Sequence, residues 1–79
     1  MDFGQADALS SARKLVRMLD GAPNPLRQAQ AAVALLMRES GWTPAEKQQI
    51  LDLAAWLAQR PQPATVKARC QAVLRSLMG

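Results

Sequence analysis

Histidine and tyrosine are absent from this 79-residue sequence, and cysteine occurs once, at Cys70. Without histidine, a general base near neutral pH would have to be a carboxylate, a lysine or the Cys70 thiol with a shifted pKa. The six acidic residues are scattered, and no two have the i, i+3 or i, i+4 spacing that places side chains together on a helix. Structural zinc sites use several thiolate or imidazole ligands, which this composition does not supply. We therefore predict a protein that is not an enzyme and that binds no metal or cofactor.

The sequence also lacks the features that take a chain into or across a membrane. Its longest apolar run, Ala31–Met37, is too short to span a bilayer. The first residues, MDFGQADALSS, have neither the basic start nor the apolar core of a signal peptide. A single cysteine excludes an internal disulfide framework. We therefore expect a cytoplasmic protein with no membrane span.

Helix-forming residues dominate what is present. Apolar residues make up 49% of the chain, which is too high for a disordered segment. Ala, Leu, Gln and Arg are abundant, β-branched residues are few, and the only aromatic residues are Phe3, Trp42 and Trp56. The length suits one domain with a small core. This composition predicts a single all-α domain over residues 1–79.

Three short clusters of turn residues divide the chain into helices. They are DGAPNP from Asp20, SGWTP from Ser40 and RPQP from Arg60. In the first two, Gly21 and Gly41 suit the left-handed position after a helix, and a proline begins the next helix. Thr43 and Glu46 match a capping box. The predicted helices cover residues 5–20, 25–40, 44–60 and 64–78, and Thr65 is a candidate cap for the last.

Each predicted helix has an apolar stripe when residues are placed about 100° apart. The stripes contain Ala8, Leu9, Ala12, Leu15, Val16 and Leu19 in the first helix; Leu26, Ala29, Val33, Leu36 and Met37 in the second; Ile50, Leu53, Ala54, Leu57 and Ala58 in the third; and Val66, Cys70, Val73, Leu74 and Leu77 in the fourth. In the second helix, Ala31, Ala34 and Leu35 make the far side apolar too, so it is predicted to be the most buried. Short connections favour antiparallel neighbours, so we predict a compact four-helix bundle with Cys70 as a buried, inert thiol.

The stretch SGWTPAEKQQIL is an imperfect match to a DNA-binding helix-turn-helix. With Gly41 as the turn glycine, Trp42 and Ile50 fall at buried positions of the motif. Two positions depart from it, because Met37 is bulky where a small residue is usual and Lys47 is charged where an apolar residue is usual. The helix after Gly41-Trp42-Thr43 would offer bases and phosphates mainly Glu46, Gln48 and Gln49, with little basic charge. A capped connector between two packed helices is the simpler interpretation.

Basic residues suggest a second, sequence-independent route to nucleic acid. The net charge is +4 and the pI is about 10.3. If the first and last helices are neighbours, their charges would form one basic face that contacts phosphates. The candidate contacts are Arg13, Lys14, Arg17, Lys67, Arg69 and Arg75. The alternative is that these side chains form the solvated outer surface that every bundle needs.

Trp56 is the main candidate for a protein interface. It lies at least about 120° from the apolar stripe of its helix, among polar residues, which is typical of an interface hot spot. Its neighbours on that side include Gln49, Asp52 and Arg60, and Leu35 and Met18 also lie off their stripes. Intramolecular packing of this second face is the alternative. Trp42, next to the turn, is predicted to be core.

The leading hypothesis is therefore a module that binds a protein partner through a helical face. Such a module would serve as a regulatory adaptor, an accessory subunit or an inhibitor of the kind carried by phages and other mobile elements. Self-association as a homodimer through the Trp56 face is one form of it. The alternative hypothesis is a small basic DNA-binding transcriptional regulator.

Overall fold

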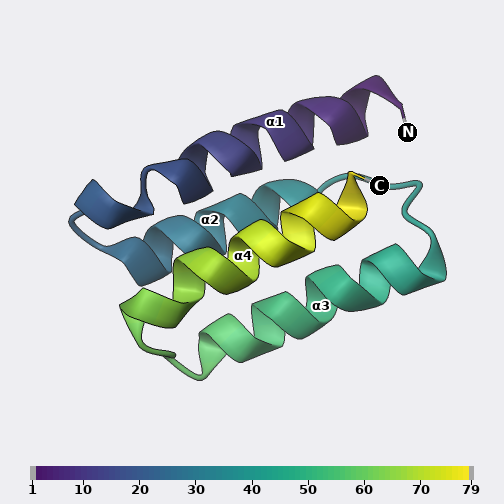
Figure 1. The fold of residues 1–79 in the computed structure, drawn as a ribbon. Helices are drawn as coiled ribbons and strands as arrows, with labels where there is room; N and C mark the ends of the chain where they lie inside the picture. Colours follow the sequence, from purple (N-terminus) through teal and green to yellow (C-terminus); the bar gives the residue numbers. More distant parts are fainter. Residues whose placement is uncertain (1, 79) are drawn as a thin grey trace.

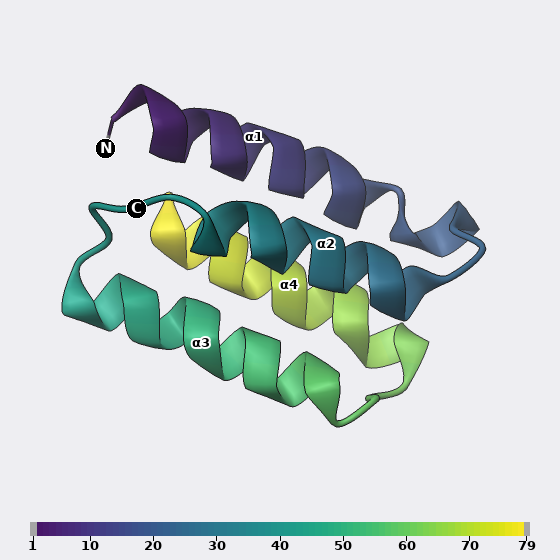
Figure 2. The same cartoon turned by 180° about the vertical axis from the view of Figure 1, so that it is seen from behind.

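The computed structural model describes residues 2–78, in which four α-helices and one short 3₁₀ turn account for most of the chain (Figure 1). The elements, in order, are α1 (Phe3–Arg17), the 3₁₀ turn η1 (Leu19–Gly21), α2 (Pro25–Met37), α3 (Pro44–Ala58) and α4 (Pro63–Leu77). Successive helices run in opposite directions, as Figures 1 and 2 both show. The predicted all-α four-helix bundle is confirmed.

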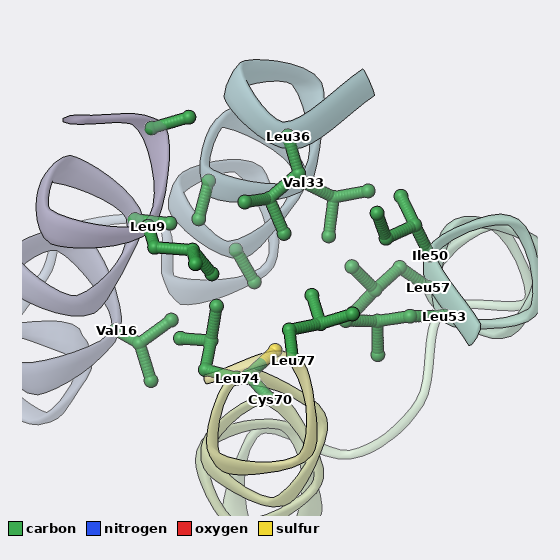
Figure 3. Close-up of a cluster of buried hydrophobic side chains, with 14 of the residues drawn as sticks. Leu9, Val16, Val33, Leu36, Ile50, Leu53, Leu57, Cys70, Leu74 and Leu77 are labelled. Atoms are coloured by element: carbon green, nitrogen blue, oxygen red, sulfur yellow. The ribbon is translucent and has the colours of Figure 1, made fainter. Parts of the chain in front are cut away.

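The helices surround one core in chain order. α1 packs against α2 and α4, α3 also packs against α2 and α4, and α2 contacts α4 across the middle. Figure 3 shows Val16, Val33, Leu53 and Leu74, which come from the four different helices, pointing toward a common centre. α2 buries two small residues, Ala29 and Ala32, on its packed face, which lets neighbouring helices approach closely. This order makes α1 and α4 neighbours.

The core follows the predicted stripes with a few exceptions. The buried apolar residues are Ala8, Leu9, Ala12, Val16, Leu19, Ala29, Ala32, Val33, Leu36, Ile50, Leu53, Leu57, Val66, Cys70, Leu74 and Leu77. Met37 and Ala58 were predicted to be core and are exposed, as are Ala31 and Ala34 on the far side of α2. In α2, Met37 lies one residue, or about 100°, beyond Leu36 and so turns away from the packed face. α2 thus contacts all three other helices and still has one side exposed to solvent.

Several helix ends differ from the sequence prediction. α1 ends at Arg17, because η1 tightens the chain into i→i+3 hydrogen bonds before the turn. Gly21 lies in that turn and does not adopt a positive φ, whereas Gly41 does, at φ +90°. The N-cap of α4 is Gln62, and the Thr65 hydroxyl only donates back to the Gln62 carbonyl. Thr43 and Glu46 form the predicted capping box.

α2 ends early because its last carbonyls find other partners. The Leu36 carbonyl oxygen accepts from the Trp42 indole Nε1 at 3.0 Å and from the Glu39 backbone nitrogen at 3.2 Å. These bonds replace the intrahelical bonds that would continue the helix to residue 40. Trp42 is thereby held at the helix junction, partly buried against the core. The sequence prediction placed it there.

A buried glutamine ties the start of α1 to the α2–α3 connection. Gln5 is only 5% exposed. Its Oε1 accepts from the Asp2 backbone nitrogen, and its Nε2 donates to the Ser40 carbonyl at 3.1 Å. Gly41 follows directly, and a β-carbon added there would lie 3.1 Å from Nε2 of Gln5. A polar side chain therefore fixes this loop, which composition and periodicity did not predict.

Candidate functional site

A groove of about 520 Å³ runs between α1 and α4 and is the candidate site. Each wall is an exposed pair of polar side chains: Arg13 and Arg17 on α1, and Gln71 and Arg75 on α4. The two residues of each pair are about one helical turn apart. The remaining lining residues are Val16, Leu74 and Met78. Val16 and Leu74 are 2% and 4% exposed, so they close the bottom of the groove, whereas Met78 at one end is 48% exposed.

The groove carries positive charge that no ion pair among residues 2–78 neutralises. None of its lining residues is acidic. Within residues 2–78 the single ion pair joins Lys67 to Asp20, so Arg13, Arg17 and Arg75 are in no ion pair there. Three guanidinium groups beside an accessible methionine form a surface that attracts anions and also offers an apolar contact.

Only three of the six predicted basic contacts come together in this groove. Lys14 does not line it, although it lies on the same helix as Arg13 and Arg17. On α4, the Lys67 ammonium lies 2.6 Å from the Asp20 carboxylate. The Arg69 guanidinium stacks on the Trp56 ring, with its carbon 4.6 Å from the ring centre. The basic face is therefore compact and does not continue along the whole of α4.

Trp56 is partly buried and packed against the core. The stacking of Arg69 shows that it lies on the flank of α3 that faces α4. A helical wheel places Trp56 away from the main stripe correctly, but it contains no information on which flank a neighbouring helix covers. Intramolecular packing thus covers part of the Trp56 side chain, which is less exposed than the sequence suggested.

The other residues predicted to join Trp56 are dispersed. Leu35 is half-buried. It lies two turns after Gln28, whose side-chain amide donates to the Leu15 carbonyl of α1, so Leu35 lies on the side of α2 that faces α1. Met18, which is 66% exposed, follows the end of α1. Gln49 is half-buried, and Asp52 and Arg60 are exposed. The Asp52 carboxylate accepts from the Gln48 amide at 2.7 Å on the same helix, and Arg60 has a positive φ of 56° after α3.

A smaller apolar hollow of about 290 Å³ lies where α2 meets α3. Met37, Trp42, Ile50 and Leu51 supply its apolar lining, and Met37 and Leu51 are 52% and 40% exposed. Sequence reasoning missed this hollow because it assigned Met37 to the core and left Leu51 without a role. The available signal was Leu51 itself, an apolar residue about 100° off the Ile50 stripe.

The α2–α3 connection differs from a helix-turn-helix in its geometry. The two helices lie side by side and antiparallel, joined by residues 38–43 (Figures 1 and 2). In the DNA-binding motif a turn of three or four residues sets the helices at about 90–120°. In this chain one flank of the start of α3, at Lys47 and Leu51, borders the hollow with α2. The connection therefore has the arrangement of a bundle hairpin.

Cys70 lies in an environment that raises its pKa. Burial raises the pKa of the thiol from 9.0 to about 11, and the side chain is 1% exposed. The sequence prediction of a buried thiol is confirmed. A thiol so shifted is almost entirely protonated at neutral pH, which suits a packing role better than a nucleophilic one.

Residues 2–78 contain no cluster of three or more His, Cys, Asp or Glu side chains suited to holding a metal ion. In the same range, none of the helices combines the length and the apolar character needed to cross a membrane. Comparison with known proteins gives no match to a family model, to a curated protein or to a solved structure. The groove's own chemistry is thus the basis for a functional proposal.

Proposed function

We propose that this chain is a small non-catalytic helical module that acts by binding a protein partner through the α1–α4 groove. The observation that carries the proposal is the set of three arginines in no ion pair, beside the exposed Met78. Arginine and methionine are enriched at protein interfaces, whereas lysine is depleted. Among the residues that line this groove, three are arginine and none is lysine.

The residue chemistry of the groove suits a protein more than a bare polyanion. A phosphate backbone is recognised by charge and gains little from an accessible methionine. A protein segment can satisfy both features, with carboxylates for the guanidinium groups and an apolar side chain for Met78. The partner is thus defined by acidic and apolar groups placed close together.

DNA binding by a small basic regulator is the second candidate, and the same three arginines favour it. It predicts affinity that falls steeply with salt, up to the slope of about three neutralised phosphates. The two candidates differ in what remains bound after nuclease treatment. Both candidates assign the binding contacts to Arg13, Arg17 and Arg75, so the same variants test them both.

Site-specific photo-crosslinking tests the proposal. A photoreactive amino acid in place of Gln71, an exposed residue of the groove wall, would report whatever occupies the groove in a lysate of the source cells. The same label in place of Ala34, exposed on α2, is the control position. We expect a nuclease-resistant protein adduct from the groove position, and an adduct of the chain with itself would identify a second copy as the partner.

Two charge reversals of equal size sharpen this experiment. Arg17→Glu changes the groove, whereas Arg27→Glu changes an exposed arginine of α2 outside it. We expect the first to abolish the adduct and the second to leave it. Adducts that contain only nucleic acid, or that respond equally to both reversals, would contradict the protein-binding proposal.

A further inference from the structure

We infer that the partner element received by the α1–α4 groove is an acidic amphipathic helix, an inference that rests on the proposed function and specifies its partner. The groove is bounded by two antiparallel helices, so a third helix would lie along it and extend the same packing. Helix-in-groove recognition uses apolar residues at i, i+3, i+4 and i+7 of the bound helix. In this groove, acidic residues would flank that stripe.

The spacing of the wall residues matches a helix. Arg13 and Arg17 are four residues apart on α1, and Gln71 and Arg75 are four apart on α4. Each pair is thus separated by roughly one helical turn, or about 5–6 Å. Carboxylates at i and i+4 on one flank of a bound helix have the same separation. The α1 wall would take two carboxylates, and the α4 wall would take one carboxylate at Arg75 and a polar acceptor at Gln71.

Backbone hydrogen bonding favours a helix over an extended segment. The groove walls are helical, so the backbone N–H groups along them are paired within α1 and α4 and are not available to an extended peptide. No strand edge is present among residues 2–78 to pair with an extended peptide. An extended segment over Val16 and Leu74 would leave its own polar backbone groups without partners, at a cost. A helix satisfies those groups internally.

Apolar contact in the groove is concentrated at one end. Met78 is half-exposed, whereas Val16 and Leu74 are almost fully covered. The flexible thioether of Met78 adapts to different apolar side chains, and the aliphatic stems of the arginines add apolar surface along the walls. The groove therefore accommodates a bound helix with one apolar anchor residue near Met78 and a short apolar stripe beside the arginine stems.

The short extent of free positive charge argues for a peptide over a nucleic acid. Lys67 and Arg69 would prolong a basic track along α4, but Asp20 holds the first and Trp56 holds the second. Along the groove, the unpaired guanidinium groups thus extend over only about two or three turns of a bound helix. A duplex, which carries a charge about every 1.7 Å, would meet few cations here.

A designed peptide provides the test. The probe is a fluorescein-labelled helical peptide of about 16 residues with leucines at i, i+3, i+4 and i+7 and glutamates on both flanks. A second peptide has glutamine in place of every glutamate, and a third has the same composition in an order that breaks the stripe. Binding to the ¹⁵N-labelled chain is followed by fluorescence anisotropy and by amide chemical shifts.

We expect the acidic peptide to shift the amides of Gln71, Arg75 and Met78, and the two control peptides to bind at least about tenfold more weakly. Arg17→Glu should weaken binding about tenfold, whereas Arg27→Glu should change it less than about twofold. Circular dichroism of both variants verifies that they are folded. Higher salt should weaken the acidic peptide selectively.

Three results would overturn the inference. These are no shift at groove amides at about 1 mM peptide, equal affinity for the glutamine peptide, and tighter binding of a random-sequence DNA duplex with the same dependence on Arg17. The outcome is separable from that of the proposed function. A nuclease-resistant adduct at position 71, together with failure of the acidic peptide, would leave the protein-binding proposal standing and reject the helix.

Discussion

Gly21 and Gly41 occupy equivalent places in the sequence pattern, and the structure predicts opposite effects when each is replaced by alanine. Gly41 has φ +90°, and a β-carbon there would lie 3.1 Å from Nε2 of Gln5. That nitrogen donates to the Ser40 carbonyl. Gly21 has no positive φ, and a β-carbon there would meet nothing within 4 Å.

The expected free energies follow from these contacts. At Gly41, a left-handed conformation costs an L-residue about 1–3 kcal/mol, and displacing the Gln5 amide puts a hydrogen bond worth about 0.5–1.5 kcal/mol at risk. The gain from restricting the unfolded chain, about 0.4–1 kcal/mol, offsets part of this loss. Gly41→Ala should therefore lower the free energy of unfolding by about 1–3 kcal/mol. Gly21→Ala should raise it by about 0.4–1 kcal/mol, because only the unfolded-state term applies.

Urea denaturation monitored by circular dichroism measures both effects. The midpoints should move in opposite directions with unchanged m-values. Gly41→Asn provides an intermediate case, since asparagine tolerates the left-handed region better than alanine does. Equal destabilisation at the two glycines, or a larger loss at Gly21, would refute the conclusion that a left-handed Gly41 and its contact with Gln5 hold the α2–α3 connection.

Four further perturbations test the packing and the electrostatics. Leu57→Ala, at a fully buried site, should lower the free energy of unfolding by about 2–5 kcal/mol. Leu51→Ala, at a 40% exposed site, should lower it by less than about 1 kcal/mol. Similar losses for the two variants in urea titrations would contradict the core assignment. Trp42→Phe removes the 3.0 Å hydrogen bond to the Leu36 carbonyl and should lower the free energy of unfolding by about 1 kcal/mol. Amide hydrogen exchange at the end of α2 should become faster. Unchanged exchange there would show that the bond does not hold this helix end. In the Trp42→Phe background, Arg69→Ala should shift Trp56 emission to longer wavelength, because the stacked guanidinium shields the ring; an unshifted spectrum would argue against the stacking. Because burial raises the pKa of Cys70 from 9.0 to about 11, the stabilising contribution of its neutral form is complete below pH 9 and is lost as the pH rises toward 11. That loss, at most about 1.4 kcal/mol per pH unit, should disappear from unfolding measurements on Cys70→Ala.

Local sequence signals determined the helices. Proline at the first helical position, the Thr43–Glu46 capping box and the apolar period of 3.6 residues act within one or two turns of chain, so they can be recognised without knowing the fold. They placed all four helices and most of the core. Cys70 was assigned to the core for the same reason, since it continues the apolar stripe of its helix. The errors at Met37 and Gly21 are errors of helix ends, where bonds from residues beyond the helix, such as Trp42 to Leu36, compete with helix propensity.

Only the tertiary structure decided which flanks of the helices meet and which remain open. The wheel position of Trp56 was correct, but the neighbouring α4 supplies Arg69 to cover it. Arg13, Arg17 and Arg75 are spread over two helices about 60 residues apart in sequence, and the contact of α1 with α4 brings them into one groove. Lys67 is equally basic, yet Asp20 from another element pairs with it. Charge and hydrophobicity are properties of single residues, whereas exposure and pairing are properties of neighbours that only the packed chain brings together.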